Sequence, residues 1–180
     1  EIAEMMVGRK VEKLVDDAGE DTRSISEDDI ILSLKDFHVE MPGEKVRGVD
    51  LDVRRGEVLG IGGLAGQGKV GIPNGILGLY KSTGTVTFDG EVIETEKLGA
   101  ALKKHIAFVS EDRRGVGLLL DESIENNISF TAMQIDGKFL KKYGPLKLFD
   151  SKKAHEHALD MIKQLDIRCT GPEQYAGRLS

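Results

Sequence analysis

Alternating apolar and polar residues predict two antiparallel hairpins in the first half of the chain. Residues 30–40, IILSLKDFHVE, have the composition of a strand, and residues 46–53, VRGVDLDV, alternate in character. The Pro-Gly sequence at 41–45, MPGEK, predicts a turn between them. A second hairpin is predicted at 84–94, where an Asp-Gly pair separates two alternating runs.

Two further runs are short and almost wholly apolar. They are VLGIGG at 58–63 and HIAFVS at 105–110. Continuous apolar runs of this length are typical of strands that are covered on both faces, as in a parallel sheet. We therefore expect a buried strand directly before and another well after the glycine-rich stretch at 62–71.

Helical spacing of apolar residues predicts the remaining elements. Ser151 is the expected N-cap of the last helix, and Asp121 or Ser123 that of the helix before it. The predicted helices are 1–15, from the glycine-rich loop to Tyr80, 96–104, 121–133 and 151–165. The order of elements predicts an α/β core and a helical subdomain, with domains at 1–29, 30–110 and 111–180.

Composition narrows the class of protein. The 180 residues carry a net charge of −6, which argues against a nucleic-acid partner because such binders need a basic surface. Cys169 is the single cysteine, so no internal disulfide can form, as is typical of a reducing compartment. Residues 16–29 are acidic and nearly free of apolar side chains, which predicts a linker. No apolar run approaches the roughly 20 residues that a membrane-spanning helix needs.

The glycine-rich stretch carries the clearest chemistry. Residues Gly63 to Lys69 fit the pattern G-x-x-x-x-G-K. In such a loop, glycines let successive backbone N–H groups point at a phosphate, and the lysine reaches the β- and γ-phosphates. The alternative is a glycine-rich turn between a strand and a helix with an incidental lysine, and the short pattern alone leaves this open.

Val70 stands where the pattern requires Ser or Thr. That hydroxyl normally ligates Mg²⁺, and valine has the shape of threonine without its oxygen. Because Mg²⁺ also binds phosphates and water, a water molecule could take the vacant position. We expect weaker binding of the magnesium–nucleotide complex, by roughly 1–3 kcal/mol, and not its loss.

Several stretches together resemble the ATP-binding subunits of sugar-type ABC importers, in which one polypeptide carries two nucleotide-binding domains. They are EMMVGR (4–9), GVDLDVRRGEVLGIGGLAGQGK (48–69), VTFDG (86–90), IAFVSEDRRGVGLLLDESIENNI (106–128) and the final RLS. The resemblance implies a partial P-loop NTPase fold: the second domain, with an antiparallel β subdomain and a helical subdomain. It also implies that the chain stops at the signature motif and lacks the C-terminal core strands.

The resemblance assigns roles to individual residues. Glu111 lies where the Q-loop glutamine is usual and is the implied metal ligand, while Ser180 corresponds to the signature serine. The nucleotide-binding set is Gly63, Gly66, Gln67, Gly68, Lys69, Val70, Glu111 and Ser180. No catalytic residue is assigned, because the Walker B aspartate, its neighbouring glutamate and the switch histidine would follow residue 180.

The implied function is ATP binding, with Mg²⁺, in the import of sugars or nucleosides. The implied partners are a membrane permease and the other nucleotide-binding domain, at the cytoplasmic face of the membrane. The apolar edge at 57–63 predicts self-association, and hydrolysis by this chain alone is not expected. Two alternatives are a non-catalytic module in which residues 111–180 dock on the permease, and an unrelated P-loop kinase or GTPase.

Overall fold

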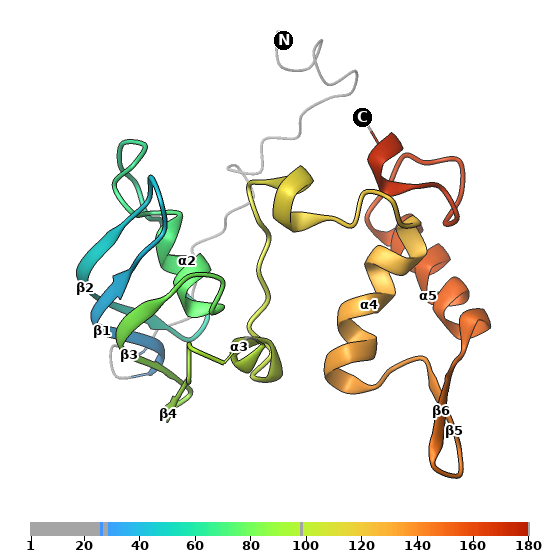
Figure 1. Cartoon of the computed structure of the whole chain (residues 1–180), viewed down its shortest axis with the longest axis horizontal. Helices are drawn as coiled ribbons and strands as arrows, with labels where there is room; N and C mark the ends of the chain where they lie inside the picture. The colour runs from blue at the N-terminus through green and yellow to red at the C-terminus, as the bar shows by residue number, and fades with distance from the viewer. Residues whose placement is uncertain (1–25, 27–28, 98, 180) are drawn as a thin grey trace, which may run out of the picture. The chain divides into compact units, whose positions relative to one another are not determined.

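The computed structural model describes residues 26, 29–97 and 99–179, which form two compact units dividing between Glu96 and Lys97 (Figure 1). The predicted helix at 1–15 and most of the acidic linker lie outside the described residues. The predicted domain boundary at residue 110 stays a prediction.

The first unit is built on a four-stranded antiparallel sheet in the order β2-β1-β3-β4. Its strands are β1 (Ile30–Val39), β2 (Val46–Arg54), β3 (Ser82–Phe88) and β4 (Glu91–Val92). Both predicted hairpins are confirmed. The second turns at Asp89 and Gly90, whose φ angles of 51° and 76° are those of a tight hairpin turn.

A β-bulge sets which side chains of β1 face the core. The pairing of β1 with β2 shifts between Leu34 and Phe37, and Asp36 has a φ of 46°. One extra residue in the strand brings Leu34, Phe37 and Val39 to the same side, where all three are fully buried. Strict alternation would have placed Phe37 on the opposite face.

One short helix, α2 (Gly71–Ile76), covers this core. Ile72 and Ile76 lie one turn apart and are both buried. The predicted helix after the loop is confirmed, but its predicted end at Tyr80 is wrong, because Gly78, with a φ of 75°, turns the chain and donates its N–H to the Gly75 carbonyl. The segment before α2 thus leads from the sheet edge into a helix of less than two turns.

The two predicted buried strands are wrong. Residues 57–64 and 105–110 form no strand, and Val58 and Val109 are 98% and 93% exposed. A parallel strand needs a neighbour to accept its backbone hydrogen bonds, and every strand pair in the described parts of the chain is antiparallel. The apolar sequence is present, but no described strand pairs with it.

The second unit is mainly helical. Its elements are α3 (Ala100–Lys103), the π turn η1 (Arg113–Gly117), α4 (Ile124–Asp136), β5 (Leu140–Tyr143), β6 (Leu146–Phe149), α5 (Ser151–Gln164) and the 3-10 turn η2 (Ala176–Arg178). Figure 1 shows the β5–β6 hairpin extending beyond the paired helices α4 and α5. This hairpin was not predicted, because its strands are four residues each and rich in lysine.

The N-cap residue predicted from the sequence is correct for α4 and wrong for α5. Ser123 caps α4 as predicted, with its hydroxyl accepting from Asn126 N at 3.2 Å. The expected cap of α5, Ser151, is instead its first helical residue. Asp150 is the cap, and its carboxylate accepts from Lys153 N at 3.4 Å.

Small side chains let α4 and α5 pack closely. Ala154 and Ala158 of α5 are buried, as are Ile124 and Ser129 of α4. The segment after α5 returns to the start of α4, where Ile124 N donates to Gln174 O at 2.9 Å. Among the helices of the described residues, none has the length and apolar character to cross a membrane.

Candidate functional site

The glycine-rich loop between residues 60 and 70 leads into α2. Gly66 and Gly68 have φ angles of 80° and 87°, a conformation that side chains with a Cβ rarely adopt. Lys69 and Val70 follow and bring the chain to the first residue of α2. The two glycines therefore supply the curled backbone that the motif predicted.

The turn between β1 and β2 lies directly against this loop. A Cβ on Gly66 would be 3.3 Å from the Gly43 carbonyl oxygen, and one on Gly68 would be 2.9 Å from the Lys45 carbonyl oxygen. A Cβ on Gly71 would collide with the carbonyl oxygen of Glu44. These glycines thus serve close packing as well as backbone curvature.

Three backbone N–H groups of the loop converge on one carboxylate, that of Glu44. Gly66 N donates to Oε1 at 2.6 Å, Gly68 N to Oε2 at 2.9 Å, and Val70 N to Oε2 at a longer 3.4 Å. The hydrogen bond from Gly66 is the largest cause that lowers the pKa of the Glu44 carboxyl, against the opposing effect of partial burial. The loop is therefore shaped to hold an anion, and a carboxylate of the chain itself lies in it.

Lys69 adds positive charge to the same loop. Its Nζ donates to the Gly63 carbonyl at 3.2 Å, and its charge also helps to lower the pKa of Glu44. A lysine held beside converging N–H groups is the arrangement that binds phosphate oxygens. Val70 offers its backbone N–H and no side-chain oxygen for a metal.

The predicted site residues do not all lie together. One loop of the first unit holds six of them: Gly63, Gly66, Gln67, Gly68, Lys69 and Val70. Glu111 lies in the second unit, where it is exposed and its carbonyl accepts from Arg113 N at 3.1 Å. Ser180 is outside the described residues. Their grouping into one nucleotide site stays a prediction.

Sequence reasoning missed Glu44. It belongs to the MPGEK turn, which contains no phosphate-binding signature. The available signal was its position in a short turn, two residues before the predicted strand that begins at Val46. That signal could not reveal which loop the turn would contact.

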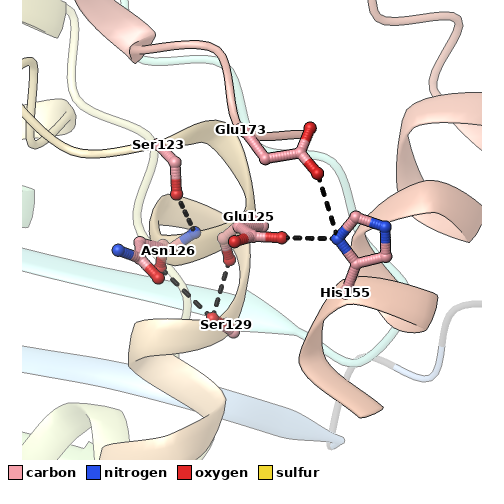
Figure 2. Close-up of polar contacts among 6 residues, drawn as sticks. All are labelled: Ser123, Glu125, Asn126, Ser129, His155 and Glu173. Carbon is pink, nitrogen blue, oxygen red and sulfur yellow. Dashed lines mark hydrogen bonds and ion pairs between the residues drawn. The ribbon is translucent and has the colours of Figure 1, made fainter. Parts of the chain in front are cut away.

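A second polar cluster joins three segments of the second unit. Figure 2 shows Glu125 of α4, His155 of α5 and Glu173 of the following segment turned toward one another. His155 Nδ1 lies 2.8 Å from Glu125 Oε2 and 3.6 Å from Glu173 Oε1. These are hydrogen-bond and ion-pair distances, so the contacts account for the cluster without a ligand.

The two histidines of α5 have separate surroundings. His157 lies beside the Phe139 ring, with 5.3 Å between ring centres, whereas His155 contacts the carboxylates. Glu125 also presents its backbone carbonyl to the Ser129 hydroxyl at 2.7 Å (Figure 2). We therefore regard the His155 cluster as a link between α4, α5 and the returning segment.

Comparison with known proteins gives a consistent result for the whole chain. The family model described as ABC transporter matches residues 46–180. That match includes β2, the glycine-rich loop and all of the second unit.

Three relatives illustrate the similarity. The ribose import ATP-binding protein RbsA 2 of Rhizobium meliloti (strain 1021) is 33% identical over 181 residues, and the nucleoside import ATP-binding protein NupA of Lactococcus lactis subsp. cremoris (strain MG1363) is 31% identical over 183. A ribose import ATP-binding protein RbsA of Halalkalibacterium halodurans is 34% identical over 181. Each match covers 100% of this chain and 33%, 34% and 33% of the respective relative. The chain therefore spans about a third of their length.

Proposed function

Because this chain belongs to the ABC transporter family, we propose that it binds ATP as part of a nucleotide-binding domain of an importer. The relatives named for ribose and nucleoside import support a sugar or nucleoside as the transported solute. The loop of the first unit is the proposed phosphate site. Its proposed ligand is the β- and γ-phosphate end of ATP.

One observation carries this proposal: the converging N–H groups of Gly66, Gly68 and Val70 already bind a carboxylate. A phosphate is also an anion with several acceptor oxygens, so the same donors suit it. Lys69 would release the Gly63 carbonyl and neutralise phosphate charge. Gln67 lies at the exposed tip of the loop between the two glycines.

Magnesium would be held chiefly by the nucleotide. Val70 supplies no ligand oxygen, so phosphate oxygens and water would fill the coordination sphere. Glu111 is the proposed protein ligand, because a carboxylate suits Mg²⁺, and Ser180 the proposed contact to a second nucleotide. The metal supplies charge neutralisation when bound, and no described residue is assigned a catalytic step.

The proposed partners follow from the family. They are a membrane permease and a second nucleotide-binding domain, which would place the protein at the cytoplasmic face of the membrane. The exposed apolar segment at 57–64 is a proposed site of self-association, since Val58 and Leu64 are 98% and 79% exposed.

A second candidate function is a docking module without nucleotide. It is favoured by apolar side chains exposed on the β5–β6 hairpin, such as Leu146 and Leu148. In that case the second unit would contact the permease, and the loop of the first unit would serve only as scaffold.

Calorimetry of ATP binding, with and without Mg²⁺, separates these functions. We expect Lys69→Ala to weaken binding by roughly 10- to 100-fold, because it removes charge-assisted hydrogen bonds to phosphate worth about 1.5–3 kcal/mol. Lys35→Ala is the matched control, because Lys35 lies on β1 and pairs with Asp52. No binding at millimolar ATP, or equal binding by both variants, would contradict the proposal.

A further inference from the structure

We propose that Glu44 is an internal ligand of the glycine-rich loop: its carboxylate occupies the place of a nucleotide phosphate, and nucleotide must displace it to bind. This inference rests on the proposed role of the loop in binding phosphate. It adds a residue outside the G-x-x-x-x-G-K pattern that sets how tightly the loop binds.

The contact uses both oxygens of the carboxylate. Oε1 accepts from one loop amide and Oε2 from two more, at 2.6, 2.9 and 3.4 Å. A phosphate entering the loop needs these same N–H groups, and each N–H makes one good hydrogen bond. Carboxylate and phosphate therefore exclude one another.

The turn holds Glu44 at the loop through its backbone. Glu44 N donates to Met41 O at 3.1 Å. The carbonyl of Glu44 packs against Gly71 at the start of α2. The backbone at Glu44 is thus held by Met41 and by the packing against Gly71, whereas its side chain has rotatable bonds that allow it to leave the loop.

Displacement needs no rearrangement of the fold. The Glu44 side chain is partly exposed and can rotate toward water while the turn stays packed. The charge of Lys69 acts on Glu44 at this loop and helps to lower the pKa of its carboxyl. Nucleotide would take over this lysine together with the amides, so the carboxylate would lose all of these partners at once.

Nucleotide can bind only those loops that are free of the carboxylate. The apparent affinity is therefore the intrinsic affinity of a free loop multiplied by the fraction of loops that are free. We expect Glu44→Ala to bind MgATP on the order of tenfold more tightly than the unchanged chain, measured by calorimetry. Glu44→Gln keeps the size of the side chain but removes its charge, so it should also bind more tightly.

Glu40→Ala is the matched control. Glu40 directly precedes the turn and carries the same charge, but it pairs with Lys45, and the three loop amides donate to Glu44 instead. Its removal should leave the affinity for MgATP within about twofold of that of the unchanged chain. An equal gain for Glu40→Ala would mean that general loss of negative charge explains the result, and would overturn the inference.

A nucleotide-free measurement tests the contact itself. The backbone amide signals of Gly66 and Gly68 should shift in NMR spectra as acid protonates Glu44, and the shift should vanish in Glu44→Gln. If these amides do not respond to pH, the contact is absent and the inference is overturned.

The affinities distinguish the remaining outcomes. Tighter binding by both Glu44 variants supports the competition. Weaker binding by them would show that the carboxylate holds the loop in shape, and would overturn it while leaving nucleotide binding intact. No binding by the unchanged chain or by any variant would overturn both the competition and the proposed function.

Discussion

Single residues decide the chemistry of the loop. Lys69 and the amides of Gly66 and Gly68 favour an anion, while Val70 withholds the oxygen that would fix a metal. Glu44 adds an acceptor that the loop motif does not contain. The affinity for nucleotide should therefore respond to substitutions at positions inside and outside the motif.

Val70→Thr should restore the dependence of binding on magnesium. The two side chains have the same shape, and the new hydroxyl adds a metal ligand worth roughly 1–3 kcal/mol. We expect a gain of about 5- to 100-fold in affinity for ATP with Mg²⁺ and little change without it, by calorimetry. Val70→Ala, which adds no oxygen, is the control. An equal gain in affinity with and without Mg²⁺ would contradict this explanation.

Asp150 should make the second unit sensitive to acid. The Lys141 ammonium, whose Nζ forms an ion pair with the Asp150 carboxylate at 2.9 Å, is the largest cause that lowers the pKa of Asp150. A lowered carboxyl pKa gives stability that is present above the ordinary value, near pH 4, and is lost as the pH falls through the folded value. Asp150→Asn should lower the melting temperature at pH 7 and reduce its change with pH.

Circular dichroism of thermal unfolding between pH 2 and pH 7 would measure this effect. Asp160→Asn is the matched control, because Asp160 lies on the same helix and its carboxylate accepts from Gln164, one turn along, and not from Lys141. If both variants keep the pH dependence of the unchanged chain, the pair of Lys141 and Asp150 contributes nothing to it.

At the scale of elements, local sequence signals predicted correctly the hairpins and helices whose backbone hydrogen bonds form within the element itself. The β1–β2 and β3–β4 hairpins and the start of α4 follow from alternation, turn residues and the Ser123 cap. The β5–β6 hairpin escaped prediction because its short, lysine-rich strands lack a clear alternation. The apolar runs at 58–63 and 105–110 led to wrong predictions of buried strands, because a buried strand depends on neighbouring strands that local sequence does not reveal.

Gly75→Ala should destabilise the first unit although alanine favours helices. A Cβ at this position would collide with Val39 and would lie 3.0 Å from Phe37 Cζ, both of them fully buried. Overpacking of this kind costs about 1–3 kcal/mol, more than the ~1 kcal/mol that alanine gains over glycine within a helix. Urea unfolding followed by circular dichroism would give the change in the free energy of unfolding.

Gly60→Ala provides the comparison for this substitution. A Cβ there would meet no atom within 4 Å, and Gly60 does not have a positive φ. Its free energy of unfolding should stay within about 0.5 kcal/mol of the unchanged chain. A stabilised Gly75→Ala would mean that α2 lies farther from β1 than the structure places it.

At the scale of the whole molecule, the apolar segment at 57–64 is the proposed site of self-association. Val58, Ile61 and Leu64 are exposed in the segment that leads into the glycine-rich loop, and unpaired apolar backbone recruits other chains. Val58→Lys should reduce self-association of the 180-residue chain by adding charge to this segment. Light scattering over a range of protein concentrations would measure the average mass.

Leu165→Lys is the control for association. Leu165 is 68% exposed at the end of α5, away from the segment in sequence and in the other unit. Its replacement should leave the average mass at each concentration unchanged. A monomeric unchanged chain at high concentration would contradict self-association through residues 57–64.

The sequence by itself determined the family, the position of the glycine-rich loop and most hairpins and helices, because these depend on neighbouring residues and local spacing. It also determined the absence of a hydroxyl at Val70. The tertiary structure decided that β1 needs a bulge at Asp36, that residues 57–64 stay unpaired, and that Glu44 lies among the loop amides. These outcomes depend on contacts between separate segments, such as Glu44 and Gly66, which lie 22 residues apart, and no local pattern encodes such contacts.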